Sequence, residues 1–135
     1  MASQTIAGHE LQYTQDNLHA FAYSGLIEVA GSEITLLEFH TNSEYLKGTV
    51  QFQQGEYNND RYEYRIYFND IQISTNILFG PGDTNGEHVG YYPLFLIIPP
   101  DIRVKMTAQN IENTNQNTQV ANFTGRVYEM LPVRN

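Results

Sequence analysis

The 135-residue sequence contains no cysteine and no tryptophan, and it has few basic residues. Without cysteine, a disulfide framework, a thiolate metal site and a thiol nucleophile are excluded, so core packing must supply the stability. The 7 basic residues stand against 15 acidic ones, the formal charge is -8, and no window gathers Lys or Arg. Direct binding to the phosphates of nucleic acid is therefore not expected.

Long apolar runs are also missing from the sequence. No stretch approaches the roughly 18 apolar residues that a membrane-spanning helix requires. The first ten residues lack the charged start and apolar centre of a secretory signal peptide. We therefore expect a soluble protein that is made in the cytosol and has no membrane partner, and the length is typical of one domain.

Amides and aromatics are abundant instead. The chain has 13 Asn and 10 Gln, whereas charged residues make up only 16% of it. Aromatic residues reach 13%, with 10 Tyr and 7 Phe. This composition favours strands and predicts a neutral, polar surface with amphipathic contact area.

Two regions differ in their patterning. Residues 1–18 are polar and aperiodic, and they are interpreted as an N-terminal arm whose contact residues are Ile6, Leu11 and Tyr13. From His19 onward the apolar residues recur with period two or in short runs, broken by Gly, Asn, Asp and Pro. This pattern predicts a β-sandwich domain over residues 19–135.

About eight strands are expected, and no window has the spacing of an amphipathic helix. The fold class is therefore all-β, an antiparallel two-sheet sandwich of the jelly-roll kind. Gly31-Ser32 and Asn69-Asp70 are expected to close hairpins, and Gly48 is expected to mark a bulge. The predicted strands are Phe21–Ala30, Glu33–Thr41, Tyr45–Gln54, Tyr62–Phe68, Ile71–Thr75, Pro93–Ile98, Ile102–Gln109 and Gln119–Met130.

The strand Pro93–Ile98 is apolar on both faces. Such a strand is either central between two covered sheets or faces a neighbouring subunit. Together with the preceding tyrosines it is the candidate seam for subunit or partner contacts. The candidate interface residues are Tyr91, Tyr92, Leu94, Phe95, Leu96 and Ile97.

Candidate metal and catalytic groups are incomplete. The loop Asp83–His88 carries alternating oxygen side chains suited to Ca²⁺, but it lacks the closing bidentate acid, and a Gly/Asp/Asn turn is the simpler interpretation. His40 shares a face with Glu38, and Glu28 would lie across the predicted hairpin, so the three suggest an acid/base pair. No nucleophile accompanies them and no Gly-x-Ser-x-Gly pattern occurs. Neither enzyme activity nor a metal or cofactor is expected.

Two further sets suggest carbohydrate chemistry. The carboxylates of Glu56, Asp60 and Glu63 would serve a glycosidase if they flanked a cleft, although such groups more often solvate an edge. Aromatic rings would stack on sugars, although alternating Tyr is more commonly core or subunit contact. The aromatic set is Tyr57, Tyr62, Tyr64, Tyr67, Tyr91 and Tyr92.

Three stretches together resemble small virion proteins of tailed bacteriophages. These are Tyr64–Ile71 (YRIYFNDI), Leu96–Pro100 (LIIPP) and Thr124–Tyr128 (TGRVY), within about the last 75 residues. The resemblance implies a capsid decoration or cement protein. Such a protein commonly has a jelly-roll fold, forms trimers or dimers and clamps neighbouring major capsid subunits from outside.

The leading hypothesis is therefore a non-catalytic structural protein located in the virion, a homo-oligomer that binds the major capsid protein or another virion protein. Its polar arm would become ordered on contact with the capsid. The alternative hypothesis is a carbohydrate- or receptor-binding β-sandwich module of a tail or baseplate. A small β-sandwich hydrolase is disfavoured because no acid, base and nucleophile converge.

Overall fold

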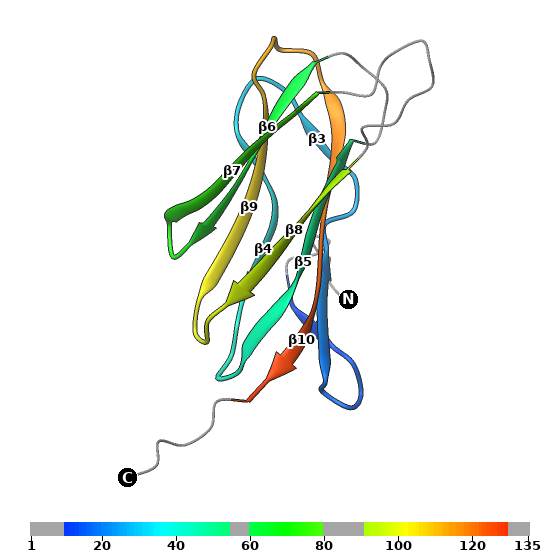
Figure 1. Ribbon diagram of the computed structural model, residues 1–135. Coiled ribbons are helices and arrows are strands. Elements are labelled where there is room, and N and C mark those ends of the chain that lie inside the picture. Colours follow the sequence, from blue (N-terminus) through cyan, green and yellow to red (C-terminus); the bar gives the residue numbers. More distant parts are fainter. Residues whose placement is uncertain (1–9, 55–59, 80–90, 130–135) are drawn as a thin grey trace, which may run out of the picture.

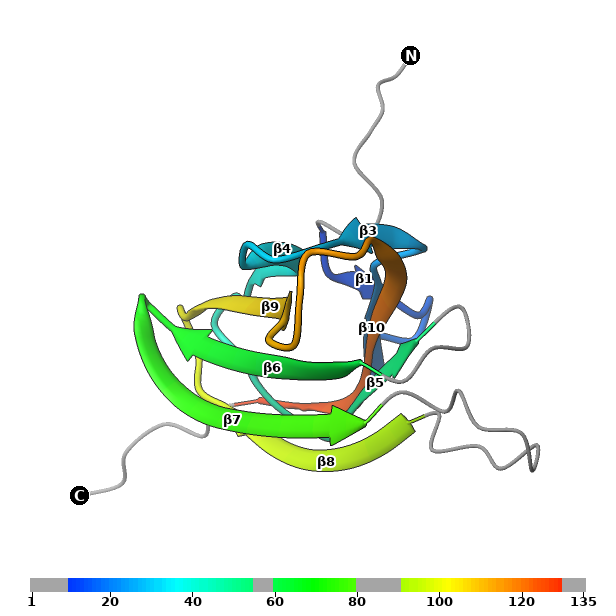
Figure 2. The same ribbon diagram turned by 90° about the horizontal axis from the view of Figure 1, so that it is seen from above.

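The computed structural model describes residues 10–54, 60–79 and 91–129, and in this part of the chain it contains strands and turns but no helix. The strands form two antiparallel sheets that pack face to face (Figures 1 and 2). The predicted all-β sandwich is thereby confirmed. The strands are β1 (Gln12–Tyr13), β2 (His19–Tyr23), β3 (Ile27–Val29), β4 (Ile34–His40), β5 (Tyr45–Gln54), β6 (Arg61–Phe68), β7 (Ile71–Phe79), β8 (Tyr91–Ile98), β9 (Arg103–Asn110) and β10 (Asn117–Tyr128).

The strand order is that of a jelly roll. Sheet A has the order β1-β2-β10-β5-β8, with β3 also on β10, and sheet B has the order β4-β9-β6-β7. Four antiparallel pairs nest inside one another: β3 with β10, β4 with β9, β5 with β8, and β6 with β7. The chain is thus one long hairpin, closed between β6 and β7, whose successive pairs alternate between the two sheets.

The start of the domain differs from the sequence prediction in two ways. The expected strand Phe21–Ala30 is interrupted after Tyr23, and Gly25 there has a φ of 71°, outside the range of a strand. The expected hairpin at Gly31-Ser32 is wrong, because β3 pairs with β10 in sheet A whereas β4 pairs with β9 in sheet B. The short connection crosses between the sheets, which sequence periodicity does not reveal.

The hairpin at Asn69-Asp70 is confirmed. Both residues have positive φ, 50° and 70°, as a two-residue turn with matching twist requires. Strand β7 continues beyond the predicted Thr75 to Phe79, and its register against β6 shifts between Ile66 and Tyr67. The bulge expected at Gly48 is absent, because β5 pairs without a shift against both β10 and β8.

Side chains from the two inner faces fill the core. Alternate residues of β5, β6, β9 and β10 are buried, as their period predicts. Aromatic contacts join the sheets: the rings of Phe39 and Phe123 lie 5.5 Å apart, and those of Phe52 and Tyr64 lie 4.7 Å apart. Aromatic side chains thus contribute to the packing between the two sheets.

Strand β8 is an edge strand, so the predicted alternative of a central strand between two covered sheets is wrong. It pairs with β5 on one side and with no other described strand. Leu96 and Ile98 point into the core, while Pro93, Phe95 and Ile97 point outward and are exposed. The second apolar face is thus uncovered in the described part of the chain.

Candidate functional site

The predicted interface residues of β8 are divided between two sides of sheet A. Phe95 and Ile97 are 63% and 53% exposed, whereas Leu96 is buried and Leu94 is half-buried against the core. Only the outward pair is therefore available to a partner. Whether a partner binds there stays a prediction.

The other predicted contact residues lie elsewhere. The side chains of Tyr91 and Tyr92 fall outside the described residues, as does Ile6 of the predicted arm. Leu11 and Tyr13 are half-buried and pack against the core. Tyr13 belongs to β1, which pairs with β2, so this part of the predicted arm is docked on sheet A.

Exposed apolar side chains concentrate at one edge of each sheet. Strand β7 ends sheet B and β8 ends sheet A, and the two edges lie on the same side of the sandwich (Figures 1 and 2). Of the eight exposed large hydrophobic side chains in the described part, five lie on these two strands. These five, here called the edge band, are Ile71, Ile73, Ile77, Phe95 and Ile97.

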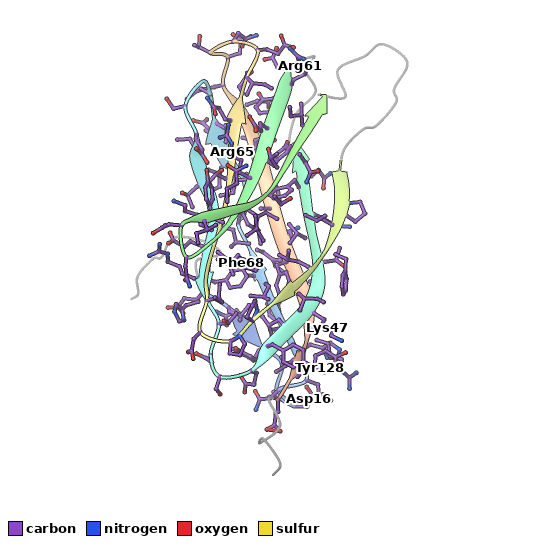
Figure 3. All side chains as sticks on the ribbon, turned by 60° about the vertical axis from the view of Figure 1, so that its left-hand side comes forward. Asp16, Lys47, Arg61, Arg65, Phe68 and Tyr128 are labelled. Atoms are coloured by element: carbon purple, nitrogen blue, oxygen red, sulfur yellow. The ribbon has the colours of Figure 1, made fainter. Side chains whose placement is uncertain are left out.

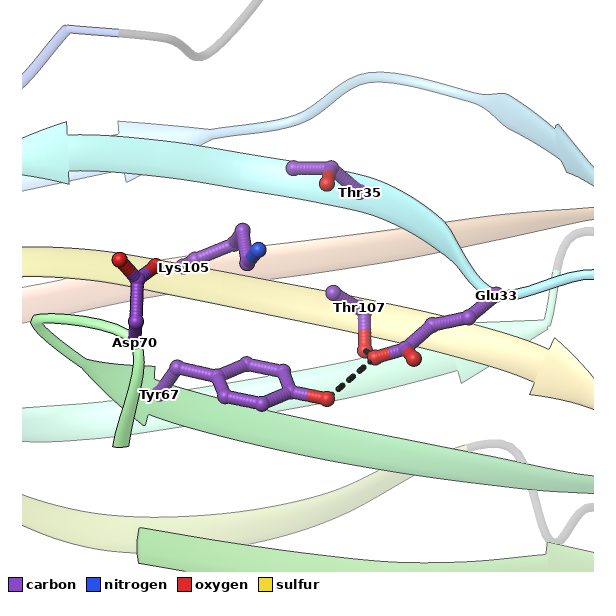
Figure 4. Close-up of a pocket in the computed structure, with 6 residues that line it drawn as sticks. All are labelled: Glu33, Thr35, Tyr67, Asp70, Lys105 and Thr107. Atoms are coloured by element: carbon purple, nitrogen blue, oxygen red, sulfur yellow. Dashed lines mark hydrogen bonds between the residues drawn. The ribbon is translucent and has the colours of Figure 1, made fainter. Parts of the chain in front are cut away.

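A pocket of about 260 Å³ opens on the outer face of sheet B. Its lining residues are Glu33, Thr35, Tyr67, Asp70, Lys105 and Thr107 (Figure 4). The hydroxyls of Tyr67 and Thr107 donate to Glu33 Oε2 at 2.6 and 2.5 Å, and Arg65 Nη1 lies 3.1 Å from Glu33 Oε1. Three side chains thus engage the Glu33 carboxylate, which lines this pocket.

The electrostatics of Glu33 fit a structural role. Burial alone would raise the pKa of Glu33, but the hydrogen bonds from Thr107 and Tyr67 and the charge of Arg65 outweigh it and lower that pKa. The hydrogen bond to Glu33 in turn raises the pKa of Tyr67. An ionised carboxylate whose oxygens already accept three partners makes a poor general base.

The rest of the outer face of sheet B is also internally paired. Arg103 forms a salt bridge with Asp70, and Arg103 Nε lies 3.6 Å from Glu38 Oε2. The hydrogen bond from Arg103 and its positive charge lower the pKa of Asp70. The Lys105 ammonium lies 5.0 Å from the centre of the Tyr67 ring. The arginines of this face are therefore paired with carboxylates, whereas Lys105 contacts a tyrosine ring.

The predicted acid/base set does not come together. Glu28 lies on β3 of sheet A, whereas His40 and Glu38 lie on β4 of sheet B. His40 Nδ1 is 2.7 Å from the carbonyl oxygen of Thr41. The prediction failed because it depended on the hairpin that the fold does not form.

The other catalytic and metal candidates are not assembled either. Asp60 accepts hydrogen bonds from Asn110 and Asn113, and Glu63 pairs with Arg65 at 2.7 Å. Glu56 and the loop 83–88 lie outside the described residues. No cluster of three His, Asp or Glu side chains that could hold a metal ion occurs in the described part.

Two of the six tyrosines proposed to stack on sugars are buried, and the side chains of three others fall outside the described residues. Tyr62 and Tyr64 are 0% and 1% exposed, so the prediction that these two rings stack on sugars is wrong. The Tyr67 hydroxyl donates a hydrogen bond to Glu33, and Tyr57 lies outside the described residues. Alternation along β6 turned the first two rings inward, which their period-two spacing already allowed.

The outer face of sheet A carries a different aromatic arrangement, which the sequence analysis missed. Strands β2 and β8 flank β10 and β5, and their outward residues form three rows across the sheet. The rows, here called the sheet A trough, are Tyr23–Asn122–Gln51–Pro93, Phe21–Thr124–Thr49–Phe95 and His19–Arg126–Lys47–Ile97. Only the registers of strands far apart in sequence bring these residues together.

No helix in the described part is long and apolar enough to cross a membrane. Comparison with protein-family models finds no match, and comparison with curated protein sequences finds none either.

Two solved structures share a partial likeness in fold. One is the infectious bursal disease virus VP2 subviral particle, with 13% identity and a TM-score of 0.44 over 85% of this chain. The other is the acetyl xylan esterase Est2A from the rumen bacterium Butyrivibrio proteoclasticus, with 13% identity and a TM-score of 0.40 over the whole chain. This chain corresponds to 38% and 33% of those two chains.

Proposed function

We propose that this protein is a non-catalytic virion structural protein that decorates or cements a phage capsid by binding neighbouring major capsid subunits. The observation that carries the proposal is the edge band, in which five apolar side chains lie on β7 and β8, one edge strand of each sheet. A monomer that kept these edges in water would expose both unpaired backbone groups and apolar surface.

The geometry of β8 suits a contact of this kind. Its inward residues Leu96 and Ile98 anchor the strand in the core, so Phe95 and Ile97 are presented on a rigid support. A partner strand can add to such an edge through main-chain hydrogen bonds while its side chains cover the outward apolar residues. Rigid presentation lowers the entropic cost of association.

The resemblance to phage virion proteins involves the same part of the fold. Leu96–Pro100 contains the end of β8, and Tyr64–Ile71 contains the hairpin from which β7 begins. Two edges on one side can contact two neighbouring capsid subunits, or one subunit and a second copy of this chain. A stable contact needs roughly 800 Å² per partner.

The test is binding to capsids of the phage whose genome encodes the chain, prepared without this protein. Phe95→Asp and Ile97→Lys should each reduce co-sedimentation strongly, because they place a charge in the apolar contact. Leu26→Asp is the matched control: Leu26 is 68% exposed but lies between β2 and β3, away from both edges. No co-sedimentation of the unaltered protein, or equal loss in all three variants, would contradict the proposal.

The oligomeric part of the proposal has its own measurement. Sedimentation velocity should give a species of two or three times the 15.5 kDa chain mass. A monomer at all concentrations would remove the homo-oligomer while leaving capsid binding to be decided by co-sedimentation.

A further inference from the structure

The sheet A trough is hollowed where β10 and β5 run side by side. A depression of about 420 Å³ is lined by residues that include Phe21, Lys47, Phe95 and Arg126. A second depression of about 360 Å³ adjoins it and shares Tyr23, Thr49 and Thr124 with it. The two together follow the central strands across the face of the sheet.

The floor of the trough consists of polar side chains that are not hydrogen-bonded to other described residues. Thr49 and Gln51 on β5 and Asn122 and Thr124 on β10 point outward, and none of these side chains hydrogen-bonds to another described residue. The outer face of sheet B is the opposite case, since its hydroxyl and carboxylate groups bond to one another. The trough thus presents hydroxyl and amide groups that no other residue in the described part of the chain engages.

The sides of the trough are aromatic or apolar. The rings of Phe21 and Tyr23 on β2 lie 5.2 Å apart and are tilted by 34°, and Tyr23 is 49% exposed. Phe95 stands on β8 in the same row as Phe21. A ligand lying on the polar floor would therefore meet ring faces on both sides.

One end of the trough is cationic. Lys47 and Arg126 are direct cross-strand neighbours, and their charged groups lie 5.0 and 5.8 Å from the centre of the Tyr128 ring. Figure 3 shows Lys47 and Tyr128 together at this end. Neither cation forms a salt bridge with a described carboxylate, whereas Arg61, Arg65 and Arg103 all do.

Asp16, one of the acidic residues near this end (Figure 3), is already hydrogen-bonded. Asp16 accepts hydrogen bonds from the Thr14 hydroxyl at 2.7 Å and from the Leu18 amide at 3.0 Å. In a chain with a formal charge of -8, Lys47 and Arg126 lie beside an aromatic ring and have no described carboxylate as a salt-bridge partner. They complement an anionic group on a ligand.

We propose that the sheet A trough binds an acidic glycan. Its sugar rings lie against Phe21 and Tyr23, its hydroxyls bond the floor, and its carboxylates meet Lys47 and Arg126. A peptide fits less well, because the backbones of β5 and β10 are fully paired within the sheet and offer no edge. Two cations are also too few to follow a nucleic-acid backbone.

The experiment is a titration of the full chain with oligogalacturonate, oligoalginate, hyaluronan and oligosialic acid. The methyl ester of each bound probe supplies the neutral counterpart with the same ring. At least one acidic probe should bind, and esterification should weaken it about tenfold or more, because the charge-assisted contacts are lost. Absence of binding by all four acids, or equal binding of the ester, would overturn the proposal.

Three sets of variants test whether the glycan binds in the trough. Lys47→Gln with Arg126→Gln should weaken the acidic probe about as much as esterification does, and should hardly change the ester. Tyr23→Ala should weaken both forms. Lys105→Gln, a cation on sheet B that also lies over a tyrosine, is the control and should leave binding unchanged. An equal loss with Lys105→Gln would show a diffuse charge effect and overturn the assignment.

The glycan test and the capsid test change different residues, although Phe95 and Ile97 belong to both the trough and the edge band. The glycan variants lie on β2, β5 and β10, whereas the capsid test changes β8. Thermal melting of each variant separates loss of binding from loss of fold. Either proposal can therefore fail while the other holds.

Discussion

Tyr64 and Gln119 form a buried hydrogen bond that joins the two sheets. The Tyr64 hydroxyl on β6 donates to Gln119 Oε1 on β10 at 2.5 Å, and both residues are no more than 1% exposed. Burial raises the pKa of Tyr64, so the hydroxyl stays protonated and keeps donating. Gln119 Nε2 is buried without a partner in the described structure. The pair is thus a buried polar link between the two sheets.

Single replacements of this pair should cost more than the double replacement. Tyr64→Phe leaves both ends of the Gln119 amide unpaired, and Gln119→Leu leaves the hydroxyl unpaired, so each should lower the free energy of unfolding by about 1–3 kcal/mol. The double variant removes every buried polar group of the pair and should recover much of that loss. Urea unfolding of the four proteins gives the coupling. A double variant that loses the sum of both single effects would contradict this account.

The turn between β6 and β7 gives a second prediction. Asn69 has a φ of 50°, and its Oδ1 accepts a hydrogen bond from the Arg103 amide at 2.9 Å. Asn69→Gly removes only the hydrogen bond, whereas Asn69→Ala also forces an unfavourable φ, at a cost of about 1 kcal/mol or more. Asn69→Ala should therefore be the less stable variant in thermal unfolding. Equal stability of the two would show that the backbone conformation contributes nothing.

Local patterns were sufficient for much of the fold. The strand bounds of β5, the inward faces of β6 and β9, and the Asn69-Asp70 turn depend on neighbouring residues, which the sequence places side by side. The strand pairing of the jelly roll, in contrast, does not depend on residues that are neighbours in the sequence. Pairing β3 with β10 joins residues about 90 positions apart, and nothing at Gly31-Ser32 says whether the chain turns back or crosses to the other sheet.

The same limit applies to the candidate sites. The apolar run of β8 was visible in the sequence, but whether Phe95 faces a core or solvent depends on the strand lying at an edge. The trough combines Tyr23, Asn122 and Gln51 through two interstrand registers. No spacing along the chain carries that information. Sequence therefore predicted the candidate strand but not the broad face beside it.

The carboxylate of Glu33 predicts an acid-dependent loss of stability. Its pKa in the folded protein is below the ordinary value of 4.5, so it binds protons more weakly folded than unfolded. Its stabilising contribution is fully present above that ordinary value and is lost as the pH falls through the lower folded pKa. Urea unfolding from pH 6 down to pH 3 should show this decline.

Glu33→Gln should flatten the decline, because the neutral amide keeps an acceptor but does not titrate. Glu28→Gln is the control, since Glu28 is exposed on β3 and forms no salt bridge with a described residue. That variant should retain the pH dependence of the unaltered protein. Identical curves for the two variants would contradict the role assigned to Glu33.

The final prediction concerns Gly48, which faces Gly125 directly across β5 and β10. Both lie in inward positions, and a Cβ on Gly48 would overlap the Thr124 carbonyl oxygen and lie 2.5 Å from the Gly125 Cα. These are backbone atoms of a central strand pair, so they cannot yield without separating β5 from β10. Gly48→Ala should therefore cost at least the roughly 1–3 kcal/mol typical of overpacking. Gly31→Ala is the matched control: its nearest contact would be the Thr114 methyl at 3.2 Å, which can move. If urea unfolding gave both variants the same stability, the close approach of the two strands would not be a constraint on this fold.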